Sequence, residues 1–173
     1  MKYEQESKQV TILLTNLSFP NGVALSKDGS FLVFAETTNC RILRYWLRTS
    51  KAGTLETFAQ LPGFPDNIKR SPRGGFWVAM HSRREKILSW ILSYPQLGNA
   101  LVRLTPVDIM KAYSVLSKYR GSGLAMRLSE DGEILETLED KRKIMRSMSE
   151  VQEKDGHLWI GSINLPFVGL YRV

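Results

Sequence analysis

Phe19-Pro20-Asn21-Gly22-Val23 and Phe64-Pro65-Asp66-Asn67-Ile68 open two copies of one passage, which lie 45 residues apart in a chain of 173 residues. The same offset places Phe31-Leu32-Val33-Phe34-Ala35 over Phe76-Trp77-Val78-Ala79-Met80. A loop, a short strand, a polar turn and a second apolar strand therefore recur as a unit. A repeat of about 40–50 residues made of short strands is typical of a β-propeller blade. The repeat predicts an all-β fold that carries function at one end of a central channel.

The first predicted blade covers roughly residues 21–60. Its second strand is a continuous apolar run of the buried type. Its fourth strand alternates with polar residues, which favours a position at the outer edge of the sheet. The four strands are expected at 21–26, 31–35, 41–47 and 54–59.

The second blade is expected to begin at Asp66, and its pattern breaks after His81. Apolar residues at spacings of three and four predict a mostly helical insertion over residues 83 to about 119. Strand pattern returns at 123–128 and 134–138. A third, incomplete blade is expected from Ser149, with strands at 157–161 and 168–173.

The chain therefore holds about two and a half blades, whereas closed propellers have about four to eight. Residues 10–14 read as a strand with no upstream partner, which we interpret as the outer strand of an otherwise absent blade. The sequence thus predicts one partial propeller domain over residues 1–173, the C-terminal half of a longer protein. Exposed blade faces and strand edges predict that the chain self-associates.

Composition narrows the classes of partner. The formal net charge is +7, but the basic residues are scattered in small clusters beside turns. Without a base-stacking motif or a recognition helix, this pattern indicates a solvated surface and no nucleic-acid partner. No apolar stretch is long enough to predict a membrane span, and the polar start of the chain shows no signal peptide. The single cysteine, Cys40, is expected to be a packed residue.

Several passages resemble the strictosidine synthase-like family of plants. They are 16–26, Ala35-Glu36-Thr37, 41–47, Lys51-Ala52-Gly53-Thr54, 61–68, 155–162 and Pro166-Phe167-Val168-Gly169. The resemblance implies a six-bladed propeller that acts on a small molecule. Related proteins include the paraoxonase-type and gluconolactonase-type calcium-dependent hydrolases and the adipocyte plasma membrane-associated protein. The family also implies a vacuolar, endomembrane or secreted location, where the sequon Asn16-Leu17-Ser18 would accept N-glycosylation.

The resemblance gives Asn21, Asp66 and Asn67 a role as oxygen ligands of a calcium ion in the channel. Each is expected to begin the innermost strand of its blade, and Ca²⁺ prefers about 6–8 hard oxygen ligands. The alternative is that these residues, which follow prolines, only shape turns. Three ligands are few, so the remaining ones are expected from blades outside this chain.

The same resemblance bears on catalysis. The acid/base glutamate of strictosidine synthase corresponds to Ser149, which cannot exchange a proton near neutral pH. Glu150 is adjacent, but neighbouring strand residues point to opposite faces. His81 corresponds to a region near the active site in paraoxonase-like relatives and is a candidate for proton transfer; the alternative is an exposed loop histidine.

The sequence therefore leaves three functions open. The first is calcium-assisted hydrolysis of an ester or lactone by the intact protein, with this fragment inactive alone. The second is the strictosidine synthase-type condensation of alkaloid biosynthesis, which Ser149 disfavours. The third is a non-enzymatic propeller that serves as a binding platform.

Overall fold

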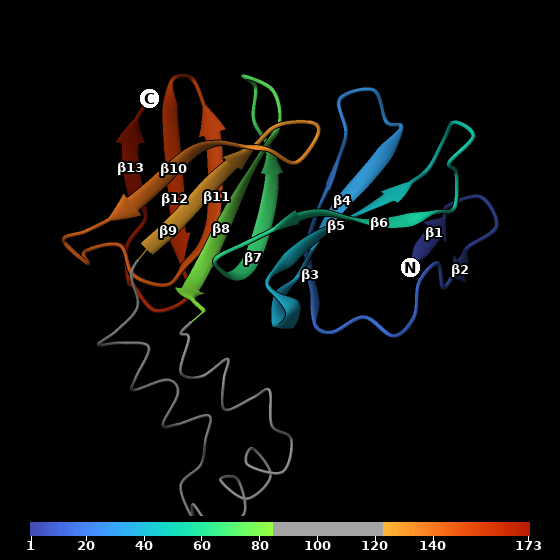
Figure 1. The fold of residues 1–173 in the computed structure, drawn as a ribbon, viewed down its shortest axis with the longest axis horizontal. Coiled ribbons are helices and arrows are strands. Elements are labelled where there is room, and N and C mark those ends of the chain that lie inside the picture. The colour runs from blue at the N-terminus through green and yellow to red at the C-terminus, as the bar shows by residue number, and fades with distance from the viewer. Residues whose placement is uncertain (85–122) are drawn as a thin grey trace, which may run out of the picture.

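The computed structural model describes residues 1–84 and 123–173, which form four antiparallel sheets (Figure 1). Two sheets have four strands, one has three, and one is a two-stranded hairpin near the N-terminus. The strands of each sheet follow one another in sequence order, as in a propeller blade. The predicted arrangement of two four-stranded blades and one partial blade is confirmed for the described residues.

The first blade contains β3 (Pro20–Leu25), β4 (Phe31–Glu36), β5 (Arg41–Trp46) and β6 (Leu55–Gln60), with a short 3-10 helix, η1 (Thr37–Asn39), after β4. The second contains β7 (Gly63–Arg70), β8 (Phe76–Arg83), β9 (Gly123–Leu128) and β10 (Ile134–Asp140). The third contains β11 (Met148–Lys154), β12 (His157–Ser162) and β13 (Gly169–Arg172). These bounds agree with the predicted strands to within a few residues.

The strands near the N-terminus differ from the expected arrangement. The strand predicted over residues 10–14 is present in part as β2 (Gln9–Thr11), but the expectation that it lacks an upstream partner is wrong, because β2 pairs with β1 (Lys2–Glu4). The chain reverses between them, with Lys8 in the left-handed region at φ 55°, so the two strands form a local hairpin.

The predicted helical insertion at 83–119 lies outside the described residues, apart from its first two positions. Of these, Arg83 is the last residue of β8.

The apolar core explains why β8 is continuously hydrophobic from Phe76 to Met80. In β8 the side chains of Phe76, Val78 and Met80 pack toward the first blade. The alternate residues Trp77 and Ala79 pack toward the third. Because both faces of β8 are covered by other blades, neither face can be polar.

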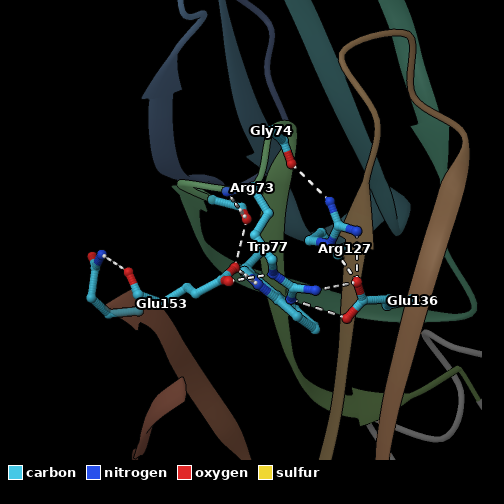
Figure 2. Close-up of polar contacts among 8 residues, drawn as sticks. Arg73, Gly74, Trp77, Arg127, Glu136 and Glu153 are labelled. Atoms are coloured by element: carbon cyan, nitrogen blue, oxygen red, sulfur yellow. Dashed lines mark hydrogen bonds and ion pairs between the residues drawn. The ribbon is translucent and has the colours of Figure 1, made fainter. Parts of the chain in front are cut away.

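Glu153 of β11 joins the third blade to the second (Figure 2). The residue is 4% exposed, and its carboxylate accepts hydrogen bonds from Ser71 Oγ (2.5 Å), Trp77 Nε1 (2.8 Å) and Arg73 Nε. Arg73 also pairs with Glu136 of β10 at 2.7 Å. Burial alone would raise the pKa of Glu153, but its three donors outweigh burial and lower that pKa. The contact therefore holds an ionised carboxylate inside the boundary between two blades.

Candidate functional site

Each of the three inner strands, β3, β7 and β11, carries a β-bulge at the same place. In each, two residues lie opposite a single small residue of the next strand: Asn21-Gly22 opposite Ala35, Asp66-Asn67 opposite Ala79, and Ser149-Glu150 opposite Gly161. We call these three residue pairs the bulge site. The bulges lie toward the end of the blades where β8 ends and β9 begins, the lower end in Figure 1. Bulges re-aim side chains and are common beside functional sites.

The structure brings the first two predicted ligands together. Asn21 Nδ2 donates a hydrogen bond of 2.8 Å to Asp66 Oδ1, across the boundary between the first and second blades. Both residues lie within strands, so the alternative in which they shape turns does not describe the backbone at these positions. The Oδ1 atom of Asn21 and the second carboxylate oxygen of Asp66 are the oxygens that this hydrogen bond leaves for a ligand.

The backbone around this hydrogen bond is tightly packed. A Cβ atom on Gly22 would lie 2.5 Å from the Cα atom of Asn67, so β3 can approach β7 only because residue 22 is glycine. Thr37 Oγ1 also donates a hydrogen bond of 2.7 Å to the Pro65 carbonyl oxygen. Asn67 therefore sits where the two inner strands meet, and its backbone is fixed by the first blade.

His81 lies within β8 and is not the exposed loop histidine of the alternative interpretation. Its ring packs beside that of Phe64, with the ring centroids 5.6 Å apart. Burial lowers the pKa of His81, and the carboxylate of Asp66 partly opposes this effect. Asp66 shows the converse: burial raises its pKa, while His81 and the Asn21 hydrogen bond act to lower it. His81 and Asp66 are thus close enough to influence each other's charge.

Glu150 is the site residue that the sequence analysis missed. The argument from strand alternation fails here because the bulge at Ser149-Glu150 interrupts the alternation. The Glu150 carboxylate approaches Lys69 of β7, with Oε2 3.6 Å from Nζ. Its Oε1 atom is buried and has no hydrogen-bond partner. Burial raises the pKa of Glu150, Lys69 and the backbone N–H of Val151 act to lower it, and the charge of Asp66 adds to the rise.

A comparison of strands would have found Glu150. Trp159 of β12 pairs with Gln152 as Trp77 of β8 pairs with Lys69, so the two tryptophans occupy equivalent positions. When the blades are aligned through these pairs, Glu150 takes the position of Asn67. Between the paired residues Gln152 and Trp159 the chain is one residue shorter than between Lys69 and Trp77, which hides this equivalence when residues are counted along the chain.

The donors of the bulge site fit a hard divalent cation. The available ligand atoms are carboxylate and amide oxygens, which are the atoms that Ca²⁺ prefers. The buried, unpartnered Glu150 Oε1 is an oxygen that lacks a positive partner. Among residues 1–84 and 123–173, however, no three His, Cys, Asp or Glu side chains are already grouped closely enough to hold a metal. A cation would have to draw these oxygens closer together.

Comparisons with known proteins agree with this fold. Residues 1–50 match the family model for strictosidine synthase. The chain is 53% identical to "Protein STRICTOSIDINE SYNTHASE-LIKE 2" of Arabidopsis thaliana, covering 100% of this chain and 48% of the relative. It is 34% identical to the adipocyte plasma membrane-associated protein of Salmo salar, covering 97% and 41%.

Two solved structures show the same fold at low sequence identity. A luciferin-regenerating enzyme aligns with a TM-score of 0.57 and 14% identity, covering 90% of this chain and 41% of that one. A gluconolactonase from Xanthomonas campestris aligns with a TM-score of 0.52 and 16% identity, covering 86% and 36%.

The described residues include no helix long and apolar enough to cross a membrane. The chain spans about half the length of the curated relatives that it matches. With its repeat, its blades and these similarities together, the chain belongs to the strictosidine synthase-like family and corresponds to the C-terminal half of its members.

Proposed function

We propose that the intact protein hydrolyses an ester or lactone, with a calcium ion bound at the bulge site. The observation that carries this proposal is the contact between Asn21 and Asp66, with His81 beside the same carboxylate. Asn21, Asp66 and Asn67 would hold the cation together with residues of the upstream blades. When bound, such an ion polarises the carbonyl oxygen of the substrate.

His81 would supply the proton transfer. Because burial lowers its pKa, the imidazole is neutral at neutral pH and can accept a proton from an attacking water. The Asp66 carboxylate would then stabilise the imidazolium that forms. Asn21, through its 2.8 Å hydrogen bond, would keep that carboxylate in place. Phe64 packs beside the imidazole and limits its movement.

The test uses this chain joined to the N-terminal half of the Arabidopsis strictosidine synthase-like 2 protein, so that the missing blades are present. Turnover of aryl esters and lactones is measured with calcium and with a chelator. We expect activity that the chelator abolishes, and that Asp66→Asn and His81→Gln each reduce by at least about a hundredfold. Ser149→Ala is the matched control and should keep most of the activity. Turnover that survives both the chelator and Asp66→Asn would refute the proposal.

A second candidate, condensation of an amine with an aldehyde as in strictosidine synthase, is favoured by one observation. Glu150 has a raised pKa and an unpartnered oxygen, which suits an acid/base carboxyl group. Formation of product from tryptamine and secologanin, lost in Glu150→Gln, would support it. Calcium binding without turnover of either substrate class would instead favour the binding-platform function.

The proposed vacuolar, endomembrane or secreted location has one structural correlate. Asn16 is exposed on the loop between β2 and β3, where an oligosaccharide could be attached. Expression in plant cells followed by glycosidase digestion would test this: a mobility shift that Asn16→Gln removes is expected.

A further inference from the structure

Glu150 lies where the third blade repeats the position of Asn67. In β7 the bulge residues Asp66 and Asn67 face Ala79, and in β11 Ser149 and Glu150 face Gly161. A Cβ atom on Gly161 would lie 3.3 Å from Glu150 Cβ and 3.7 Å from Ser149 Oγ. The third blade therefore presents a carboxylate at the position where the second presents an amide.

The surroundings of Glu150 leave half of its carboxylate without a partner. Oε2 lies 3.6 Å from Lys69 Nζ, which is a long ion pair, and Oε1 is buried with no hydrogen bond. Asp66 is close enough that its charge disfavours ionisation of Glu150. Two carboxylates that repel each other, with one buried oxygen unpaired, form an arrangement that a divalent cation would stabilise.

We propose that Glu150 is a ligand of the cation at the bulge site and that the Lys69 ammonium group substitutes for the cation when none is bound. This inference rests on the proposed function, because it requires the cation that Asn21, Asp66 and Asn67 would hold. It extends the set of ligands to the third blade and gives that set a second formal negative charge. Binding would pull Glu150 away from Lys69 and toward Asp66.

Lys69 makes the proposal specific. Its side chain is 44% exposed, so the ammonium group can move into solvent when the carboxylate turns toward a cation. The positive charge of Lys69 then competes with calcium for Glu150. Removal of that charge should tighten calcium binding, whereas removal of the Glu150 charge should weaken it. If Glu150 and Lys69 had only a structural role, loss of either charge would not change the calcium affinity in opposite directions.

Calcium binding to the fusion with the N-terminal half of the Arabidopsis strictosidine synthase-like 2 protein, measured by isothermal titration calorimetry with calcium chloride, tests the proposal. We expect Glu150→Gln to raise Kd by about tenfold or more, because one ligand charge is lost. Lys69→Met should lower Kd several-fold, and the double variant should resemble Glu150→Gln. Glu133→Gln and Lys154→Met change exposed charges elsewhere in the second and third blades and should leave Kd unchanged.

The outcomes separate this inference from the proposed function. If Asp66→Asn abolishes binding while Glu150→Gln and Lys69→Met both bind as the parent fusion protein does, Glu150 is not a ligand and the proposed site stands without it. If the parent fusion protein binds no calcium, both are overturned. Should Glu150→Gln fail to fold by circular dichroism, the Lys69→Met result decides alone: unchanged affinity refutes the proposal and tighter binding supports it.

Discussion

Asn21 and Asp66 hold equivalent positions in successive blades, and the side chain of one donates a 2.8 Å hydrogen bond to the side chain of the other. The repeat that identifies the fold therefore also builds the site. The inner strands β3 and β11 both contact β7, so their bulge residues lie at the boundaries with the second blade. Substitutions of the bulge residues should therefore change cation binding and the stability of the fold by different amounts.

Asp66→Asn should remove cation binding without loss of stability. Burial raises the pKa of Asp66, so its ionised form is disfavoured in the folded protein. At pH values above the raised pKa the carboxylate therefore reduces stability, and a neutral amide, which can still accept from Asn21, removes that cost. Urea unfolding at pH 7 should show a midpoint equal to or above that of the parent chain. A midpoint well below it would mean that the Asp66 charge stabilises the fold.

Gly22→Ala should destabilise the chain by about 1–3 kcal/mol, as is typical when an atom is forced into a packed region. The new Cβ would lie 2.5 Å from Asn67 Cα, and backbone cannot move aside cheaply. Val23→Ala in the same strand is the control, because Val23 is exposed and its truncation should cost less than about 0.5 kcal/mol. Denaturant midpoints of the two variants check the difference; equal midpoints would show that β3 and β7 are not in close contact.

Glu153→Gln should destabilise by about 3 kcal/mol, because the buried donors of Ser71 and Trp77 and the charge of Arg73 lose their ionised acceptor. Glu133→Gln, an exposed change in the second blade, should have almost no effect. Chemical unfolding of the two variants at pH 7 measures the contrast.

The same carboxylate predicts a pH dependence. Because the pKa of Glu153 is lower in the folded protein than the ordinary value of 4.5, its contribution is complete above that value. The contribution is lost as the pH falls through the lowered folded pKa. The stability difference between the parent chain and Glu153→Gln should therefore shrink on acidification below pH 4.5. A difference that stays constant down to the acid transition would argue against an ionised Glu153.

The predicted self-association has a specific candidate surface. Trp159 of β12 and Leu170 of β13 pair across the third blade and are 49% and 58% exposed. Trp159→Lys should shift sedimentation toward the monomer. Leu135→Lys, at a similarly exposed residue of β10, is the control and should not. If both variants sediment like the parent chain, association does not use this face.

The fold could be predicted because strand and turn signals are local. The 45-residue offset located the boundaries of the first two blades, and the continuous apolar run at residues 31–35 indicated the buried strand β4. The hairpin of β1 and β2 was missed because its residues are exposed and mostly polar, so no hydrophobic pattern marks both strands.

The site could be predicted only in part, because bulges have no simple sequence signal. Asn21, Asp66 and Asn67 are predicted as ligands from the resemblance, whereas the argument against Glu150 relies on an alternation that the bulge interrupts. The role of Glu153 depends on Ser71, Arg73 and Trp77, which lie about 80 residues earlier. Such a contact depends on how two blades pack, which no local pattern specifies.

The equivalence of Trp77 and Trp159 provides an optical reporter of blade packing. Trp77 is 2% exposed with its indole N–H bound to Glu153, whereas Trp159 is half-exposed within the described part of the chain. An indole in water emits at longer wavelength than one in an apolar boundary between blades. When a further blade covers the third, Trp159 should acquire the surroundings of Trp77, and its fluorescence should shift to the blue. Joining of the two halves of the propeller can thus be followed in solution without an added label.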